Sequence, residues 1–178
     1  TATPAPTPNA CVRNSLMDAR EVVIGAIVPL SRPGAVLTGY AMQTAFNIAV
    51  EDLNAAGGIH NLPVRLVTYD TASSAELGAR YTERLITLDC AAIIVGGHHQ
   101  QVALAARDMA HRYGVPLIIS SAMADEITSV HVAEIFRISP AWTMIPQMPG
   151  HWLAEVGDYN QDDYELAIVV ADNSAETA

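Results

Sequence analysis

Short apolar runs alternate with longer segments of helical periodicity along most of this chain. The apolar runs predict strands at 22–28, 64–70, 91–95, 116–120, 134–139 and 165–172. Between them, helices are predicted at 38–58, 73–89, 100–113 and 142–157, with a short helical segment at 124–128. This alternation predicts an α/β fold, in which right-handed crossovers join parallel strands of one sheet.

Two of these segments predict burial in more detail. In the first helix, apolar residues recur at spacings of three and four, which predicts one buried face. That face comprises Met42, Ala45, Phe46, Ala49, Val50 and Leu53, and Gly57 and Gly58 are expected to end the helix. The run at 91–95 is apolar without alternation, so we expect a strand buried on both faces.

The most polar motif of the chain is "GGHHQQ", which directly follows the third predicted strand. In α/β sheets, ligands bind at the carboxyl ends of the strands, and a helix start favours an anionic group. A metal site is disfavoured because His98 and His99 are adjacent and lack further ligands at helical spacing. Hydrolysis is disfavoured because no GxSxG motif accompanies Ser120 and Ser121. The histidines are interpreted as cleft walls or as a solvated rim.

Charge excludes one class of partner. The chain has 178 residues, nine arginines, no lysine and 19 carboxylates, which give a net charge of −10. Such a chain repels phosphate backbones, so nucleic acid is excluded as a partner. The start, "TATPAPTPNAC", is rich in proline, and residues 1–20 are predicted to be a disordered tether of the kind that separates a membrane anchor from an exported domain.

Several phrases of the sequence resemble one known family. They are "VVIGAIVPLSRPGA", "AVEDLNAAGGIHNLPVRLVTYDTASS", "TERLITLD", "RYGVPLIISSAMADEIT" and "FRISPAW". Together they resemble the type I periplasmic solute-binding proteins of the branched-chain amino acid group. The resemblance implies a three-layer αβα lobe with a mostly parallel sheet of order 2-1-3-4-5. It also implies a second lobe, a hinge, and a small-molecule solute held between the lobes.

The resemblance further implies a role and a location. A protein of this group is no enzyme, needs no cofactor or metal, and delivers its solute to an ABC-type membrane permease. It is periplasmic or otherwise extracytoplasmic, and the tether would suit a lipid anchor. Alternatives are a ligand-sensing domain of the same fold in a signalling protein and an α/β hydrolytic enzyme. Residues 21–139 would form lobe 1 and 140–178 the crossover and the start of lobe 2, so we expect a fragment that lacks its second lobe.

Motif by motif, the resemblance assigns ligand-binding residues. Gln100 takes the place where relatives have a serine, Ser121 and Ala122 the place of their alanines, and Met123 that of a threonine. These four, with His98, His99 and Leu37, are the predicted ligand-binding residues. Asp70 is interpreted separately, as a turn or cap residue at the end of the second strand.

The two cysteines are Cys11 and Cys90, whose spacing excludes CxxC redox and zinc motifs. They are either a structural disulfide or two independent thiols. Cys11 precedes the first predicted strand and Cys90 the third, so both fall at the amino ends of strands. If the strand order is 2-1-3-4-5, these strands are neighbours, and we predict a disulfide that joins the tether to the sheet.

Overall fold

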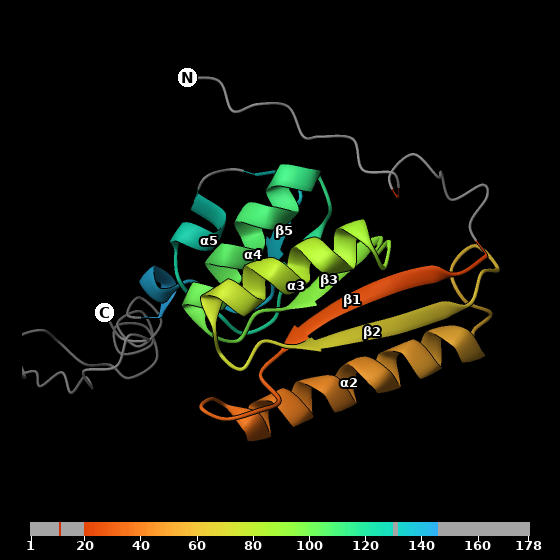
Figure 1. Ribbon diagram of the computed structural model, residues 1–178, viewed down its shortest axis with the longest axis horizontal. Coiled ribbons are helices and arrows are strands. Elements are labelled where there is room, and N and C mark those ends of the chain that lie inside the picture. The colour runs from red at the N-terminus through yellow and green to blue at the C-terminus, as the bar shows by residue number, and fades with distance from the viewer. Residues whose placement is uncertain (1–10, 12–19, 130–131, 146–178) are drawn as a thin grey trace, which may run out of the picture.

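The computed structural model describes residue 11 and residues 20–129 and 132–145. Its strands are β1 (Val22–Val28), β2 (Val64–Asp70), β3 (Ile93–Gly96), β4 (Leu117–Ile119) and β5 (Ile135–Arg137). Its helices are α2 (Val36–Ala55), α3 (Ala75–Thr87), α4 (Gln100–Tyr113), α5 (Glu126–Ser129) and the 3-10 turn η1 (Trp142–Met144) (Figure 1). Most of the predicted tether, the predicted strand at 165–172 and most of the predicted helix at 142–157 lie outside the described residues.

The five strands form one parallel sheet in the order β2-β1-β3-β4-β5, which confirms the predicted fold class and strand order. Each connection from one strand to the next runs through a helix, as parallel pairing requires. All the carboxyl ends therefore lie along one edge of the sheet.

The main core lies between the sheet and helices α3 and α4. Alternate strand residues, among them Ile27, Ile94 and Leu117, are fully buried there against Leu85 and Val102. α3 packs along α4, and both lie on the same side of the sheet in Figure 1. Burial of these branched side chains is the dominant favourable contribution to folding.

The opposite face of the sheet carries α2, which packs on β1 and β2. Met42, Phe46 and Val50 are half-buried, as predicted, whereas Ala45, Ala49 and Leu53 are exposed. The predicted buried face of this helix is thus wider than the observed one. The reason is that a helix placed near one margin of the sheet has neighbours on one side only.

The prediction that the third strand is buried on both faces is wrong for the described part of the chain. Ile94 is fully buried, but Ile93 and Val95 on the other face are only half-buried. An apolar run reports that both faces avoid water, and it does not say which segment covers each face.

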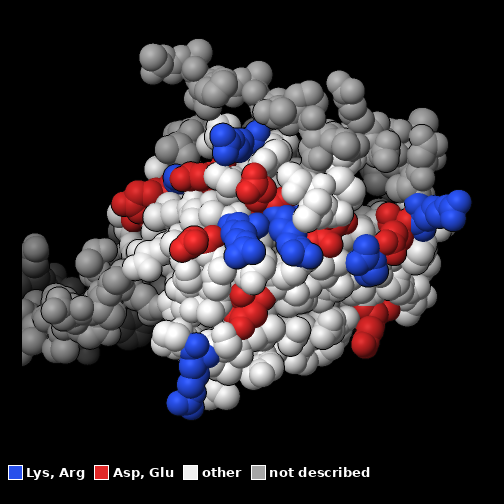
Figure 2. Space-filling view, in the orientation of Figure 1, with Lys and Arg blue, Asp and Glu red and all other residues white. Residues whose placement is uncertain are grey.

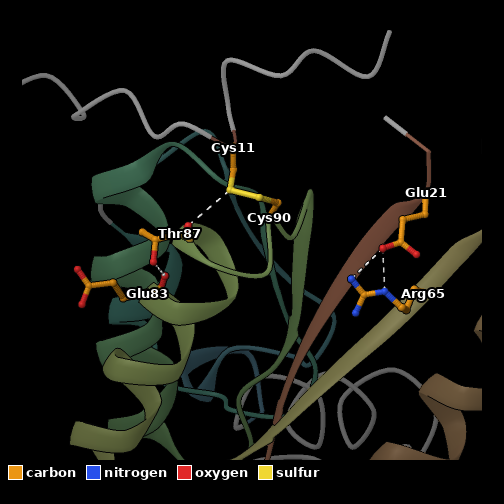
Figure 3. Close-up of a disulfide and its surroundings, with 6 residues drawn as sticks. All are labelled: Cys11, Glu21, Arg65, Glu83, Thr87 and Cys90. Carbon is orange, nitrogen blue, oxygen red and sulfur yellow. Dashed lines mark hydrogen bonds and ion pairs between the residues drawn. A yellow bond between two sulfur atoms is a disulfide. The ribbon is translucent and has the colours of Figure 1, made fainter. Parts of the chain in front are cut away.

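The predicted disulfide between Cys11 and Cys90 is confirmed, with 5.1 Å between the two Cα atoms (Figure 3). It lies at the amino ends of the strands, next to the end of α3, where the Cys11 sulfur is 3.6 Å from the carbonyl oxygen of Thr87. The bond thus fixes one residue of the amino-terminal segment to the edge opposite the carboxyl ends of the strands.

Candidate functional site

Three loops meet the carboxyl edge of the central strands. They follow β1, β3 and β4, and the ligand-binding residues that the sequence predicts lie in these loops or in the first turn of the helix that follows. Backbone hydrogen bonds fix the latter two loops to each other: the Ser120 N–H donates to the Gly96 carbonyl at 2.8 Å, and the Ala122 N–H donates to the Gly97 carbonyl at 3.2 Å. The two glycines and the "SSAM" segment therefore form one connected surface.

The two histidines lie on this surface, and one of them contacts the neighbouring loop. His98 Nδ1 is 3.1 Å from Ser121 Oγ, and the rings of His98 and His99 meet edge to face with centroids 4.7 Å apart. Both side chains are half-buried. The structure thus brings together two predicted residues from different loops, His98 and Ser121.

Gln100 is the first residue of α4, as predicted. The preceding residue, His99, is the N-cap and makes no side-chain capping hydrogen bond, and the first turn carries no acidic residue. The first backbone N–H groups of a helix have no partner within the helix and favour negative charge. Beside them, the half-buried Gln100 amide can donate to an acidic group or accept from a hydroxyl.

Ala122 has a positioning role in the structure. It is 2% exposed, its N–H is already bonded to Gly97, and its carbonyl accepts a 2.8 Å hydrogen bond from the Ser139 hydroxyl. Its backbone therefore holds the two loops and the chain after β5 together. Met123 next to it is half-buried, and its side chain is apolar and adaptable.

Arg137 is a positioning residue that the sequence did not reveal. From the end of β5, its Nη1 donates to the carbonyls of Met123 at 3.0 Å and of Ala124 at 2.7 Å. The Trp142 N–H donates to the same Met123 carbonyl at 3.0 Å. These bonds fix the loop after β4 from the side of the chain that leads out of the sheet.

Leu37 lies at the carboxyl edge of the sheet on a different segment, the one that follows β1. It lies in the first turn of α2, its side chain is 86% exposed, and residues 32–38 line a hollow of about 530 Å³ beside it. Asp70 holds the residues just before this hollow by accepting hydrogen bonds from the Leu30 and Ser31 N–H groups. Leu37 is thus available for apolar contact, on a different loop from the pair formed by His98 and Ser121.

Asp70 acts as the predicted turn residue, and its partners extend to the next loop. Its Oδ1 accepts hydrogen bonds from the N–H groups of Leu30 at 2.7 Å, Ser31 at 3.3 Å and Ala72 at 2.8 Å. Burial raises the pKa of Asp70, but the Ser31 side chain and these backbone groups outweigh burial, so the net pKa is lowered.

We expect Asp70→Asn to lower the free energy of unfolding by about 1–3 kcal/mol at pH 7, because the hydrogen bonds lose their charged acceptor. A lowered native pKa contributes stability above the unfolded value of about 3.9, and this contribution disappears as pH falls through the native pKa. Urea unfolding at pH 7 and pH 3 should therefore show a gap between wild type and variant that narrows in acid. Asp52→Asn, which alters an exposed carboxylate of α2, is the control; a gap independent of pH would contradict the assignment.

Within residues 20–129 and 132–145, no three His, Cys, Asp or Glu side chains gather where they could hold a metal ion. In the same part of the chain, no helix has the length and apolar character needed to cross a bilayer.

A parallel sheet whose polar loops gather at the carboxyl edge defines the class of ligand-binding α/β domains. Residues 21–175 match the family model described as "Periplasmic binding protein". The chain belongs to this family of solute-binding proteins, which confirms the resemblance inferred from the sequence.

Relatives of known sequence agree with this assignment. The chain is 29% identical over 162 residues to Leu/Ile/Val-binding protein homolog 7 of Brucella abortus (strain 2308), covering 89% of this chain and 40% of the relative. It is 30% identical over 120 residues to Leu/Ile/Val-binding protein homolog 8 of Brucella suis biovar 1, covering 67% and 29%. The chain thus spans less than half the length of the relatives that it matches.

Solved structures give the same picture. The branched-chain amino acid transporter substrate binding protein LivJ of Streptococcus pneumoniae, in complex with isoleucine, matches with a TM-score of 0.69 and 27% identity, over 78% of this chain and 39% of that one. A solute binding protein of an ABC transporter from Rhodopseudomonas palustris BisB5, in complex with 3,4-dihydroxy benzoic acid, matches with a TM-score of 0.67 and 25% identity, over 78% and 37%.

Proposed function

We propose that this chain is the amino-terminal lobe of an extracytoplasmic solute-binding protein that serves an ABC-type permease and does not catalyse a reaction. The observation that carries the proposal is the joining of the loops after β3 and β4 into one polar surface beside the start of α4. A second lobe would close over this surface and exclude water from the solute. Export and a lipid anchor on the amino-terminal tether belong to the same proposal.

The solute that fits this edge is a small organic acid, either an amino acid or an aromatic acid. Its acidic group would lie at the start of α4, held by the Gln100 amide and the Ser121 hydroxyl. His98 would orient that hydroxyl through the 3.1 Å contact between His98 Nδ1 and Ser121 Oγ. Its apolar part would contact the Met123 side chain, with Leu37 approaching from the other wall. The two solutes named for the structural neighbours, isoleucine and 3,4-dihydroxy benzoic acid, both have this division into an acidic and an apolar end.

The contact between His98 and Ser121 supports binding rather than hydrolysis. A serine nucleophile requires a base, a group that orients the base, and donors for an oxyanion, all directed at one reacting atom. Here the neighbouring N–H groups of Ser120 and Ala122 are already bonded to Gly96 and Gly97. The arrangement therefore supplies a hydrogen-bonding surface and leaves those two N–H groups unavailable as oxyanion donors.

The proposal is tested by titrating the ¹⁵N-labelled chain with leucine, isoleucine, valine and 3,4-dihydroxybenzoate and following its amide resonances. A lobe alone leaves the solute partly wet, so we expect weak binding, with shifts concentrated at 97–101 and 120–124. Gln100→Ala should weaken the affinity about tenfold or more, because a hydrogen bond to a charged group is worth about 1.5–3 kcal/mol.

The chain offers a matched control for this experiment. Gln101 is the next residue of α4 and is exposed, so Gln101→Ala removes the same type of side chain at a position outside the proposed site. Equal affinities for the Gln100 and Gln101 variants would contradict the site. Shifts spread evenly over the chain, or none with any solute of the panel, would contradict solute binding by this edge.

A further inference from the structure

The backbone carbonyls around the proposed binding surface already accept hydrogen bonds from the chain itself. The Gly96 carbonyl accepts from the N–H and the hydroxyl of Ser120, at 2.8 and 3.2 Å. The Met123 carbonyl accepts from Arg137 Nη1 and from the Trp142 N–H, both at 3.0 Å. A carbonyl oxygen has two lone pairs, so the acceptor capacity of these two carbonyls is filled.

Three neighbouring carbonyls are engaged in a similar way. The Ala124 carbonyl accepts from Arg137 Nη1 at 2.7 Å. The Gly97 carbonyl accepts from the Ala122 N–H at 3.2 Å, and the Ala122 carbonyl accepts from the Ser139 hydroxyl at 2.8 Å. Ala122 and Ala124 are only 2% and 3% exposed, so their backbone is also closed to a solute. The guanidinium and hydroxyl donors beside the surface are thus directed at the protein's own acceptors.

Carboxylates are equally unavailable. The two segments that form the surface, 97–101 and 120–124, contain no aspartate or glutamate. Asp70, at the end of β2, and Asp125, which follows the second segment, both hold the chain itself. Asp70 Oδ1 accepts from three backbone N–H groups, and Asp125 Oδ1 accepts from the Thr143 hydroxyl at 2.7 Å. Elsewhere, Figure 2 shows acidic and basic side chains interspersed over α3.

These contacts distinguish the two ends of an amino acid. An ammonium group has three N–H donors and no acceptor, so it is held by carboxylates or by oxygens with a free lone pair. A carboxylate has the opposite requirement, which the Gln100 amide and the Ser121 hydroxyl can satisfy by donating to it. An ammonium brought against acceptors that are already engaged would lose water without gaining partners, and this costs free energy.

We propose that this lobe binds its solute through the acid group and provides no site for an α-ammonium group. The solutes that it selects are carboxylic acids with an apolar part and no amino group, either aromatic or branched aliphatic. This inference rests on the proposed function and narrows the solutes proposed there by excluding amino acids.

Three molecules that share one carbon skeleton test the two ends separately, in an amide-resonance titration of the full ¹⁵N-labelled chain. Leucine carries both groups, 4-methylpentanoate only the acid and 3-methylbutylamine only the amine. We expect 4-methylpentanoate to shift resonances at 97–101 and 120–124 and to bind about threefold to tenfold more tightly than leucine, because a lobe alone leaves the ammonium partly wet. The amine should shift none of these resonances.

A charge change at the proposed acid site should reverse this order. Gln100→Glu places a carboxylate where the solute's acid group would lie, so we expect it to weaken binding of 4-methylpentanoate about tenfold or more and to favour the amine. Gln101→Glu is the matched control, since it adds the same charge at the next, exposed residue, where water and salt screen it.

The outcomes separate this inference from the proposed function. If leucine binds as tightly as 4-methylpentanoate, or if the amine shifts the same resonances, the inference is overturned while solute binding stands. Equal effects of the two glutamate variants also overturn it, because the acid group then lies elsewhere. If no acid, with or without an amino group, shifts these resonances, the proposed function fails and the inference fails with it.

Discussion

Removal of the Cys11–Cys90 disulfide is expected to lower the free energy of unfolding by about 4 kcal/mol. The bond closes a loop with a sequence separation of 79 residues that includes β1, β2 and α3. In the chain-entropy model, a cross-link of this length restricts the unfolded chain by about that amount. The measurement is urea unfolding of wild type and of the variant with Cys11→Ala and Cys90→Ala, both without reductant.

Two observations separate the loss of the cross-link from damage to the native structure. Reductant should lower the unfolding midpoint of wild type and leave that of the double variant unchanged. The bond lies at the amino edge of the sheet (Figure 3), whereas the loops at 97–99 and 120–125 follow the carboxyl ends of β3 and β4. Solute-induced shifts near Gln100 should therefore persist in the double variant. Equal midpoints for oxidised and reduced wild type would contradict the prediction.

The alternation of strands and helices was predictable because it depends on features that are local in sequence. Apolar runs of five to eight residues and helical periodicity between them predict the alternation, and the alternation predicts a parallel sheet. The order 2-1-3-4-5, by contrast, came from family phrases such as "NAAGGI" and "YGVPLI", because periodicity alone does not say which strands are neighbours. The disulfide prediction depended on that order and was confirmed with it.

What failed concerns contacts between segments distant in sequence. The run at 91–95 is apolar on both faces, yet Ile93 and Val95 are only half-buried, because the described helices cover one face of β3. Ala45 and Ala49 match a helical period but face away from the sheet. A periodic pattern identifies surfaces that avoid water, and only the tertiary structure shows which of them already have a neighbour.

The candidate site shows the same division. Gln100 at the start of α4 and Asp70 at a turn follow from local signals, namely a helical pattern after a strand and an aspartate before a turn. The contact of His98 with Ser121 depends on the register between β3 and β4, which no local pattern encodes. Arg137 was missed for the same reason, since its role is to bond two carbonyls of a loop 13 and 14 residues away.

Gly96→Ala is the substitution expected to perturb the fold and the site together. Gly96 has a φ of +130°, which residues other than glycine rarely adopt. An added Cβ would lie 2.1 Å from the Ile27 carbonyl oxygen. The dihedral alone costs about 1–3 kcal/mol. The collision is with the backbone of β1 in the middle of the sheet, so the strand pair must shift, and we expect a total loss of about 4 kcal/mol or more.

Gly57 and Gly114 separate the two contributions to this loss. They have φ values of +100° and +66°, and an added Cβ at either position meets nothing within 4 Å. Gly57→Ala and Gly114→Ala should therefore cost only the dihedral preference, about 1–2 kcal/mol. Urea unfolding measures the loss in free energy of unfolding for each variant. The loss at Gly96 minus the loss at Gly57 or Gly114 is the cost of the collision, and equal losses in all three variants would contradict a collision.

The collision at Gly96 also bears on the site, because the Gly96 carbonyl accepts hydrogen bonds from the Ser120 N–H at 2.8 Å and the Ser120 hydroxyl at 3.2 Å. A shift of β3 away from β1 would move this carbonyl and, with it, the loop that carries Ser121 and Met123. Gly96→Ala should therefore weaken solute binding even in the fraction that stays folded, whereas Gly114→Ala, at the far end of α4, should not. The close approach of two backbones at the end of β3 thus links stability of the sheet to the shape of the proposed binding surface.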